Sequence, residues 1–327
     1  MNHSDIARAF GFQLSGQDLL ESIYPYAPVY RLKDDRGDWI MKRTQKPLAR
    51  ARAVAVWTRA LDVHHIPVVT PASGFGENPR AFHADNTFDE VWVVYPFLPG
   101  ARYTGDPSQI RAAGDLLGSI HGAEPDADYG LKQSETVVAV EPAEIEQDIS
   151  GILEHVNAFH PNAAADAEML LLARAQRYFE HALPVLLNMQ LPLANCSWDF
   201  KASNLVFPTD SAPVLVDVDN AGRIPRLYDL AIASLLFHNE AMGPARIFTS
   251  KEWRVFLEGY SRHIQFGEEE KRAWGDLLLC AWMDEALWLL RDDQQGWTEP
   301  RQSQLLLSLL LKDLSTLALS PQARQAL

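Results

Sequence analysis

The stretch from Val91 to Gly100, VWVVYPFLPG, changes character halfway, from an unbroken apolar run to a segment with two prolines and a glycine. Such a run, bounded by Pro and Gly, is typical of a buried strand that gives way to an extended connector. Residues before the stretch alternate like strands, whereas residues after it show apolar positions at helical spacing. We therefore predict an α+β chain with two lobes, residues 1–99 and 100–327, joined by a hinge.

The N-terminal lobe is predicted to hold a small β-sheet and one main helix. Residues 24–41 alternate around a polar turn, which predicts a hairpin that ends on Lys42. Residues 48–61 are rich in Ala, Arg and Val and lack Gly and Pro, which favours a helix. Further strands are expected at 68–69, 81–83 and 90–95.

The C-terminal lobe is predicted to be larger and mostly helical. Apolar residues recur there at three- and four-residue intervals, and only the segment 191–224 returns to short β segments separated by turns. The predicted helices are 107–121, 142–156, 163–187, 227–240, 251–263, 268–291 and 300–318.

The composition excludes several classes of protein. The 327 residues include 43 acidic and 29 basic ones, a net charge of −14, without a long basic run, so no nucleic-acid partner is expected. The 2 cysteines fit neither a disulfide framework nor a zinc site. No charge-free apolar stretch reaches the ~18 residues of a membrane span, so we expect a cytoplasmic protein without a membrane partner. Two interpretations of the net negative charge stay open: ordinary solubility, or an electrostatic field that attracts a cationic substrate.

Two acids and an amide lie close together in the second lobe. Asp199 follows an apolar segment, Asn204 comes five residues later, and Asp217 ends the hydrophobic run that starts at Pro213. Transfer of a γ-phosphoryl group needs a base for the attacking hydroxyl, oxygen ligands for Mg²⁺ and a cation over the phosphates. Asp199 can serve as the base, and Asn204 and Asp217 can serve as the metal ligands.

Two lysines complete this set. Lys201, two residues after Asp199, can offset charge that develops in the transition state. Lys42 ends a predicted strand, from which an ammonium group can reach the α and β phosphates. A single lysine is ordinarily a solvated surface residue. Lys42 favours a nucleotide site only in combination with the downstream loop that carries Asp199 and Asn204. The pattern predicts a kinase.

The order of these motifs resembles the aminoglycoside phosphotransferase and choline kinase type family, which shares the protein kinase fold. The resemblance rests on Asp199-x4-Asn204, on Asp217 and on the following Tyr228-Asp229-Leu-Ala, and it includes Leu116–His121, which resembles a family helix. It implies a bilobal fold with a small β-sheet lobe before a larger helical lobe. It also implies an enzyme that uses Mg²⁺ and ATP or GTP.

The resemblance assigns roles to individual residues. It implies that Asp199 is the catalytic aspartate, that Asn204 and Asp217 hold Mg²⁺, and that Lys42 contacts the nucleotide phosphates. Asp229 is implied to brace the catalytic loop.

The hinge is implied to bind the adenine through its backbone. The Pro96 carbonyl would accept a hydrogen bond and the Leu98 N–H would donate one, and Pro96 itself has no N–H to offer. The implied acceptor is a hydroxyl of a small molecule, such as an aminoglycoside-like antibiotic or an amino-alcohol metabolite.

Three departures from the family pattern keep another function open. Ser197–Trp198 stands where most of the family carries His-Gly, and the predicted phosphate-covering loop, residues 21–27, contains no glycine. The family usually pairs its strand lysine with a helix glutamate, but the only acid in residues 43–76 is Asp62. Lys42 is therefore expected to be unpaired in the free protein. A pseudokinase that acts as a binding module stays an alternative.

Phosphorylation of a peptide or protein Ser/Thr is a second alternative. Lys201 forms the Asp-x-Lys pattern that resembles protein Ser/Thr kinases. Only eleven residues separate Asp217 from Asp229, however, and this interval leaves no room for a long activation segment. The short connection favours small acceptors.

Asp284 and Glu285 lie one turn before Trp288 on a predicted helix. Charged helix positions usually point to solvent. If these two instead face the cleft, they would bind a cationic ligand through charge-assisted hydrogen bonds. The sequence leaves both interpretations open.

Overall fold

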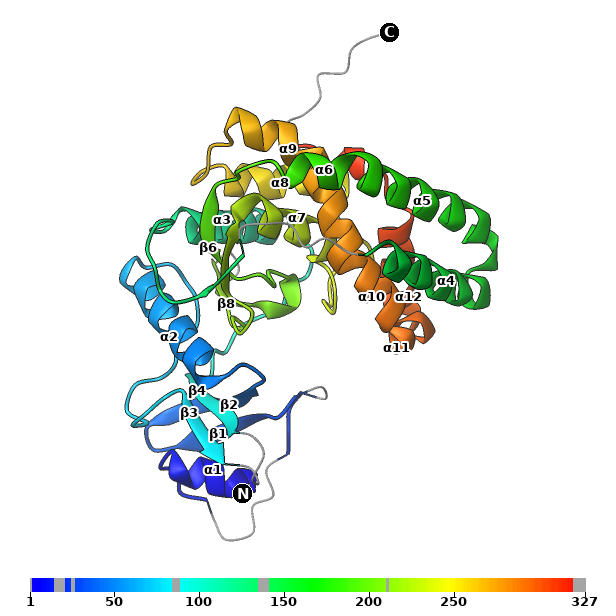
Figure 1. Cartoon of the computed structure of the whole chain (residues 1–327). Coiled ribbons are helices and arrows are strands. Elements are labelled where there is room, and N and C mark those ends of the chain that lie inside the picture. The colour runs from blue at the N-terminus through cyan, green and yellow to red at the C-terminus, as the bar shows by residue number, and fades with distance from the viewer. Residues whose placement is uncertain are drawn as a thin grey trace.

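The structure, a computed structural model, describes residues 2–14, 21–24, 27–83, 89–134, 141–209 and 212–319. A small part with an antiparallel sheet is followed by a larger, mostly helical part, with helix α2 beside the passage from one to the other (Figure 1). The predicted α+β class is therefore confirmed, while the boundary at residue 99 stays a prediction. Pro25 and Tyr26 of the predicted phosphate-covering loop lie outside the described residues.

The N-terminal part is built on a four-stranded antiparallel sheet with the order β1-β2-β4-β3. Its strands are β1 (Val29–Asp34), β2 (Gly37–Thr44), β3 (Arg80–His83) and β4 (Asp89–Pro96). Lys42, near the end of β2, lies opposite Val29 on one side and Val93 on the other. The hairpin prediction is thus confirmed, and Lys42 is held in the middle of the sheet.

Helix α1 (His3–Ala9) was not predicted from the sequence. Its N-terminus is stabilised by a capping box, in which Asn2 and Asp5 each accept a hydrogen bond from the other's backbone N–H. Ile6 and Phe10 pack into a buried cluster with Trp92 and other residues of the sheet. The short length of the helix explains why apolar periodicity did not indicate it.

The predicted strand at 68–69 is wrong. Val68 forms only an isolated parallel bridge with Leu215, and the Val69 N–H donates to the Leu215 carbonyl at 2.8 Å. Prolines at positions 67 and 71 flank this pair, and a proline has no N–H for a ladder. The segment therefore links the two parts of the molecule instead of extending the sheet.

Helix α2 (Leu48–Val63) belongs to both parts. It follows β2 in the chain, but its buried residues Val54, Trp57 and Leu61 join the large hydrophobic core of the helical part. The lobes therefore share a packed helix, which limits how independently they can move.

The C-terminal part contains two small sheets and a set of packed helices. Strands β5 (Lys132–Gln133), β9 (Gly222–Pro225) and β6 (Leu193–Cys196) form one sheet, and β7 (Leu205–Thr209) pairs with β8 (Ala212–Leu215). The helices are α3 (Pro107–Gly122), α4 (Pro142–Phe159), α5 (Ala164–Arg177), α6 (Leu183–Leu186), α7 (Arg226–Leu236), α8 (Ser250–Tyr260), α9 (Glu268–Ala281), α10 (Leu287–Asp292), α11 (Gln294–Thr298) and α12 (Pro300–Leu310). Among the described residues, none of these helices has the length and apolar character needed to cross a bilayer.

Three of the predicted long helices are shorter or interrupted. A π-helical turn at Tyr178–Ala182 separates α5 from α6, and another at Trp282–Ala286 separates α9 from α10. The helix predicted to reach residue 318 ends at Leu310 and is followed by a 3₁₀ turn at Leu314–Leu317. Because π turns keep the apolar spacing nearly helical, the sequence pattern did not reveal them.

Helices α3 and α8 touch backbone to backbone through glycines. A Cβ added at Gly114 would lie 2.0 Å from the Phe256 carbonyl oxygen, and one at Gly118 would lie 2.5 Å from the Tyr260 carbonyl oxygen. Neither oxygen belongs to a flexible side chain, so a larger residue would force the helices apart. This contact sets the position of His121 at the end of α3.

We expect Gly114→Ala to lower the free energy of unfolding by roughly 2 kcal/mol or more, because overpacking at a backbone contact strains both helices. The matched control is Gly151→Ala in α4, where the nearest atom to an added Cβ is Arg291 Cγ at 3.9 Å. There alanine should leave stability unchanged or raise it by up to about 1 kcal/mol. Urea unfolding of both variants measures the difference, and equal effects would contradict the packing argument.

Candidate active site

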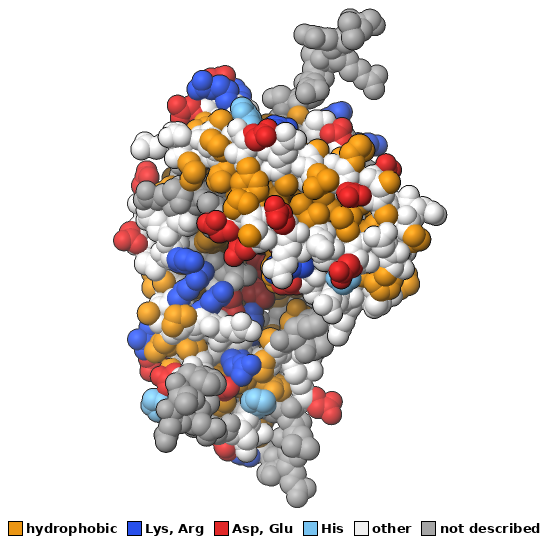
Figure 2. Space-filling view, turned by 45° about the vertical axis from the view of Figure 1, so that its right-hand side comes forward, with side chains coloured by type: hydrophobic (Ala, Val, Ile, Leu, Met, Phe, Trp, Pro, Cys, Tyr) orange, Lys and Arg blue, Asp and Glu red, His pale blue; other side chains and the backbone are white. Residues whose placement is uncertain are grey.

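The predicted site residues gather in the recess between the two parts. Figure 2 shows acidic side chains on the floor of this recess and Lys and Arg side chains along one rim. Asp199 and Asn204 come from the loop between β6 and β7, Asp217 follows β8, and Lys42 belongs to β2. Three separate elements thus bring their polar groups to one place.

Asp199 and Asn204 are held together by direct hydrogen bonds. The Asn204 side-chain NH₂ donates to the Asp199 carbonyl oxygen at 3.0 Å and to its carboxylate Oδ2 at 3.2 Å. Between them Phe200 is buried and the Ala202 N–H donates to the Phe237 carbonyl at 2.8 Å, which ties the loop to the end of α7. The loop is therefore anchored on both its polar and its apolar side.

Asp217 is linked to the same loop through the backbone. The Val216 N–H donates to the Asn204 carbonyl at 2.9 Å. The Asp217 carboxylate then projects toward the N-terminal part, where both of its oxygens lie 2.8 Å from Lys42 Nζ.

The expectation that Lys42 is unpaired in the free protein is wrong. Besides Asp217, Lys42 Nζ contacts Asp219 Oδ2 at 3.1 Å. Burial has the largest single effect on the pKa of Lys42 and lowers it. The two carboxylates together outweigh burial, so the pKa is raised. Sequence analysis looked for an acid on the helix after β2, whereas the structure supplies it from a distant loop.

Lys201 lies between two carboxylates. Its Nζ is 3.6 Å from Asp199 Oδ1 and 3.2 Å from Glu240 Oε2. Burial raises the pKa of the Asp199 carboxyl, and the positive charge of Lys201 opposes the rise. Lys201 thus stands beside the predicted base, and Glu240, which sequence analysis did not single out, restrains it.

Asp229 lies in a buried hydrogen-bonded chain with His121 and Tyr260. Its Oδ2 is 3.0 Å from His121 Nε2, both side chains are fully buried, and His121 Nδ1 pairs with the Tyr260 hydroxyl at 2.9 Å. The other carboxylate oxygen is buried and has no hydrogen-bond partner among the described residues. Through these contacts Asp229 links α7 to α3 and α8. The role of Asp229 in bracing the catalytic loop stays a prediction.

Residues 96–98, the predicted hinge, direct two backbone groups away from β2. The Phe97 N–H donates to the Asp38 carbonyl at 2.9 Å, which directs residue 97 toward β2. Since successive residues of an extended chain point to opposite sides, the Pro96 carbonyl and the Leu98 N–H point away from β2. The Leu98 side chain packs on a small apolar cluster that contains residues of both parts: Val69, Val93, Tyr95, Ile40 and Val216.

Trp198 occupies the position where the family usually has glycine, and it adopts a left-handed conformation with φ of 55°. Its ring lies against Gly222, where an added Cβ would meet Trp198 Cε3 at 2.8 Å. Glycine at 222 therefore makes room for tryptophan at 198. The departure from the family pattern therefore places a tryptophan with a left-handed backbone directly before Asp199.

Asp284 and Glu285 lie on the π-helical turn and face inward. Asp284 accepts a hydrogen bond from the Tyr228 hydroxyl, and the Glu285 carboxyl interacts with the Trp198 side chain. Burial raises the pKa of Glu285 to about 7, the charges of Asp284 and Asp199 add to the rise, and the interaction with Trp198 opposes it. These contacts favour the cleft-facing interpretation over the solvated one.

The oxygen atoms at the site suit a hard divalent cation. The Asn204 NH₂ is used in bonds to Asp199, so its side-chain carbonyl oxygen is the group left for a metal. The Asp217 side chain is 41% exposed and accessible from the recess. One carboxylate and one amide oxygen, with room for phosphate oxygens and water, match what Mg²⁺ accepts from a protein.

Sequence analysis missed two acids of the site, Asp219 and Glu240. Asp219 could have been found, because it follows Asp217 by two residues and in an extended segment such residues share a side. Glu240 carries no comparable signal, since it lies in the turn after α7, about forty residues away in the chain from its partner, Lys201.

A sequence profile of the phosphotransferase enzyme family matches residues 26–274. A search of curated protein sequences found no match. Among solved structures, the chain is similar to an amicoumacin kinase in complex with AMP-PNP, Ca²⁺ and Ami, with 17% identity, a TM-score of 0.64, and coverage of 98% of this chain and 96% of that one. A microcompartment-associated aminopropanol kinase gives 15% identity and a TM-score of 0.66, with 98% and 100% covered.

An aminoglycoside phosphotransferase from Alicyclobacillus acidocaldarius gives 14% identity and a TM-score of 0.55, with 89% and 91% covered. At such identities these likenesses show a shared fold, which confirms the predicted kinase-like architecture. The profile match confirms the predicted class of enzyme, a phosphotransferase, and it spans every predicted site residue from Lys42 to Asp229. The chain therefore belongs to the phosphotransferase enzyme family.

Proposed function

We propose that the protein is a small-molecule kinase that transfers the γ-phosphoryl group of ATP or GTP to a hydroxyl of an amine-bearing acceptor. The observation that carries the proposal is the convergence of Asp199, Asn204 and Asp217 on one recess beneath Lys42. Each of these groups matches a part that phosphoryl transfer requires. Within this proposal, residues 1–99 form the nucleotide lobe and residues 100–327 form the acceptor lobe.

Asp199 acts as the base that accepts the proton of the acceptor hydroxyl. Its raised pKa, caused by burial and opposed by Lys201, suits a group that must gain a proton during the reaction. Lys201 stabilises negative charge that develops on the transferred group. Lys42 binds the nucleotide phosphates from the sheet above, while the Pro96 carbonyl and the Leu98 N–H hold the base.

Asn204 and Asp217 would hold Mg²⁺. When bound, the ion neutralises charge on the phosphates and orients them for transfer. The amicoumacin kinase was solved with a nucleotide analogue and Ca²⁺, which supports a nucleotide and a divalent metal as co-substrate and cofactor here.

The acceptor is proposed to carry a positive charge near its hydroxyl. Glu285 and Asp284 lie on the inward face of the π-helical turn, and Glu285 is close enough to Asp199 for their charges to interact. An ammonium group between these acids and Trp198 would gain charge-assisted hydrogen bonds and a cation–π contact. The similarity to an aminopropanol kinase supports an amino-alcohol acceptor, and the net charge of −14 adds a favourable long-range field.

The alternatives differ from this proposal in specific ways. A pseudokinase would bind nucleotide without turnover, and the paired state of Lys42 removes one reason to favour it. A peptide kinase would need an ordered segment for its substrate, and the interval between Asp217 and Asp229 is occupied by the short strand β9 and the start of α7.

We expect Asp199→Asn to lower kcat by roughly 10²–10⁴-fold, because the base is lost, while nucleotide affinity stays nearly unchanged. ADP release is measured with a panel of amino alcohols, aminoglycosides and neutral sugars. Thermal shift with Mg-ATP reports binding, which stabilises the folded state by mass action.

Asp217→Ala should lose the thermal shift with Mg-ATP. A shift in the unaltered protein without ADP release from any member of the panel would favour the pseudokinase. No shift at all would overturn the proposed kinase and leave a nucleotide-free pseudokinase as the alternative.

We expect Glu285→Gln to raise KM for an amine acceptor about tenfold at pH 8, because one charged hydrogen bond to the amine is lost. Because the pKa of Glu285 is raised to about 7, the carboxylate form is populated above pH 7 and is lost below it. Affinity for the amine should therefore increase as pH rises through 7 in the unaltered protein, and the variant should lack this increase.

The matched control is Glu258→Gln, which removes an exposed carboxylate that pairs with Arg111 on the surface. It should leave KM and its pH dependence unchanged. A Glu285→Gln variant that behaves like this control would contradict the cationic acceptor.

A further inference from the structure

The two acids that contact Lys42 differ in how they are held. The side chain of Asp217 is 41% exposed, whereas that of Asp219 is 18% exposed. Val218 between them is buried and anchors the segment, so both carboxylates project from the same side of the chain. Asp217 is thus open to the recess and Asp219 is enclosed.

Lys42 is shared between the two acids. Its Nζ donates hydrogen bonds to both oxygens of Asp217 at 2.8 Å and forms an ion pair with Asp219 Oδ2 at 3.1 Å. An ammonium group has three N–H donors, so two of them are occupied by Asp217. Release of Asp217 frees these two donors for a phosphate and leaves the ion pair with Asp219 in place.

Helix α2 offers no acid in place of Asp219. Between Leu48 and Leu61 it carries arginines and apolar residues, and its acid, Asp62, is exposed at the far end. Instead, Arg50 of α2 donates from Nη2 to the Asn220 carbonyl at 3.1 Å, directly after Asp219. The helix therefore clamps the loop that bears the acid, and does not bear the acid itself.

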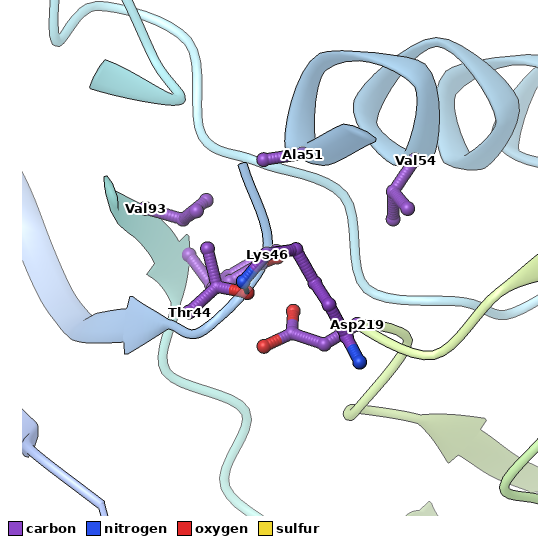
Figure 3. A pocket seen from close by; sticks show the side chains of 7 residues that line it. Thr44, Lys46, Ala51, Val54, Val93 and Asp219 are labelled. Carbon is purple, nitrogen blue, oxygen red and sulfur yellow. Dashed lines mark hydrogen bonds between the residues drawn. The ribbon is translucent and has the colours of Figure 1, made fainter. Parts of the chain in front are cut away.

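The surroundings of Asp219 form a small pocket under α2. Figure 3 shows Asp219 beside Thr44 and Lys46, with Ala51, Val54 and Val93 around them. Thr44 is buried and its side chain lines this pocket next to Asp219 (Figure 3). A carboxylate that is enclosed in this way and paired with Lys42 has little freedom to turn away.

We propose that Asp219 is a positioning residue that holds Lys42 in the place that contacts the nucleotide phosphates. It takes the part that a helix glutamate plays in the usual family pattern, but from the loop after β8 in the C-terminal part. Asp217 shares Lys42 only until the nucleotide and metal arrive. This inference rests on the proposed function, because it assumes that Lys42 binds phosphates.

The experiment is a double-mutant cycle on ADP affinity, measured by calorimetry in EDTA so that metal binding by Asp217 does not contribute. The four proteins are the unaltered chain, Asp219→Asn, Lys42→Met and the double variant. If Asp219 acts through Lys42, Asp219→Asn should weaken ADP binding about tenfold more in the unaltered background than in the Lys42→Met background. Asp62→Asn, which removes the exposed acid of α2, should leave ADP affinity unchanged.

Thr44→Val provides a second variant if Asp219→Asn fails to fold. It removes the hydroxyl that lines the pocket beside Asp219 but keeps every charge, and it should show a smaller coupling with Lys42 of the same sign. A merely structural role for Asp219 predicts equal effects in both backgrounds.

Three results would overturn the inference. Equal effects in the two backgrounds would show that Asp219 does not act through Lys42. A loss of affinity seen only when Mg²⁺ is present would make Asp219 a metal ligand instead. Absence of ADP and Mg-ATP binding by the unaltered chain would overturn the proposed function, and this inference with it.

Discussion

The charge pairing of Lys42 with Asp217 and Asp219 joins the two parts of the molecule across the recess. A lysine that is mostly buried in the middle of a sheet must have acidic partners, because desolvation of an unpaired ammonium is costly. Among the described residues, the acids that meet Lys42 come from the loop after β8 and not from the sheet, so this loop lies beneath the sheet. The pairing aligns the sheet with the loop that carries Asp199 and Asn204, and the apolar cluster around Val69 and Val93 likewise combines residues from both parts.

Behind the recess, the helical part gives the loop a rigid base. The buried contact of His121 with Asp229 and Tyr260 depends on the close approach of α3 and α8, which glycines permit. The π-helical turn between α9 and α10 changes the phase of the helix by about one residue. The two acids on this turn meet Trp198 and Tyr228.

Sequence reasoning predicted most of this framework, and the errors have physical causes. The order of strands, hinge and helices followed from apolar periodicity and from Pro and Gly, apart from a strand at 68–69 that is a single bridge between prolines. The convergence of Asp199, Asn204 and Asp217 followed from motif spacing. The partner of Lys42 did not, because the search was confined to the neighbouring helix, while the acids that meet it lie about 175 residues further along the chain.

The sequence by itself determined which groups are available for phosphoryl transfer and how they are spaced locally. Asp199 and Asn204 are only five positions apart and Asp217 follows a strand, so local geometry constrains these side chains without help from distant segments. Which charges pair with each other was decided only by the tertiary structure. Pairing depends on burial and on the distance between segments far apart in the chain, and both arise only when the sheet, the hinge and the helical core pack together.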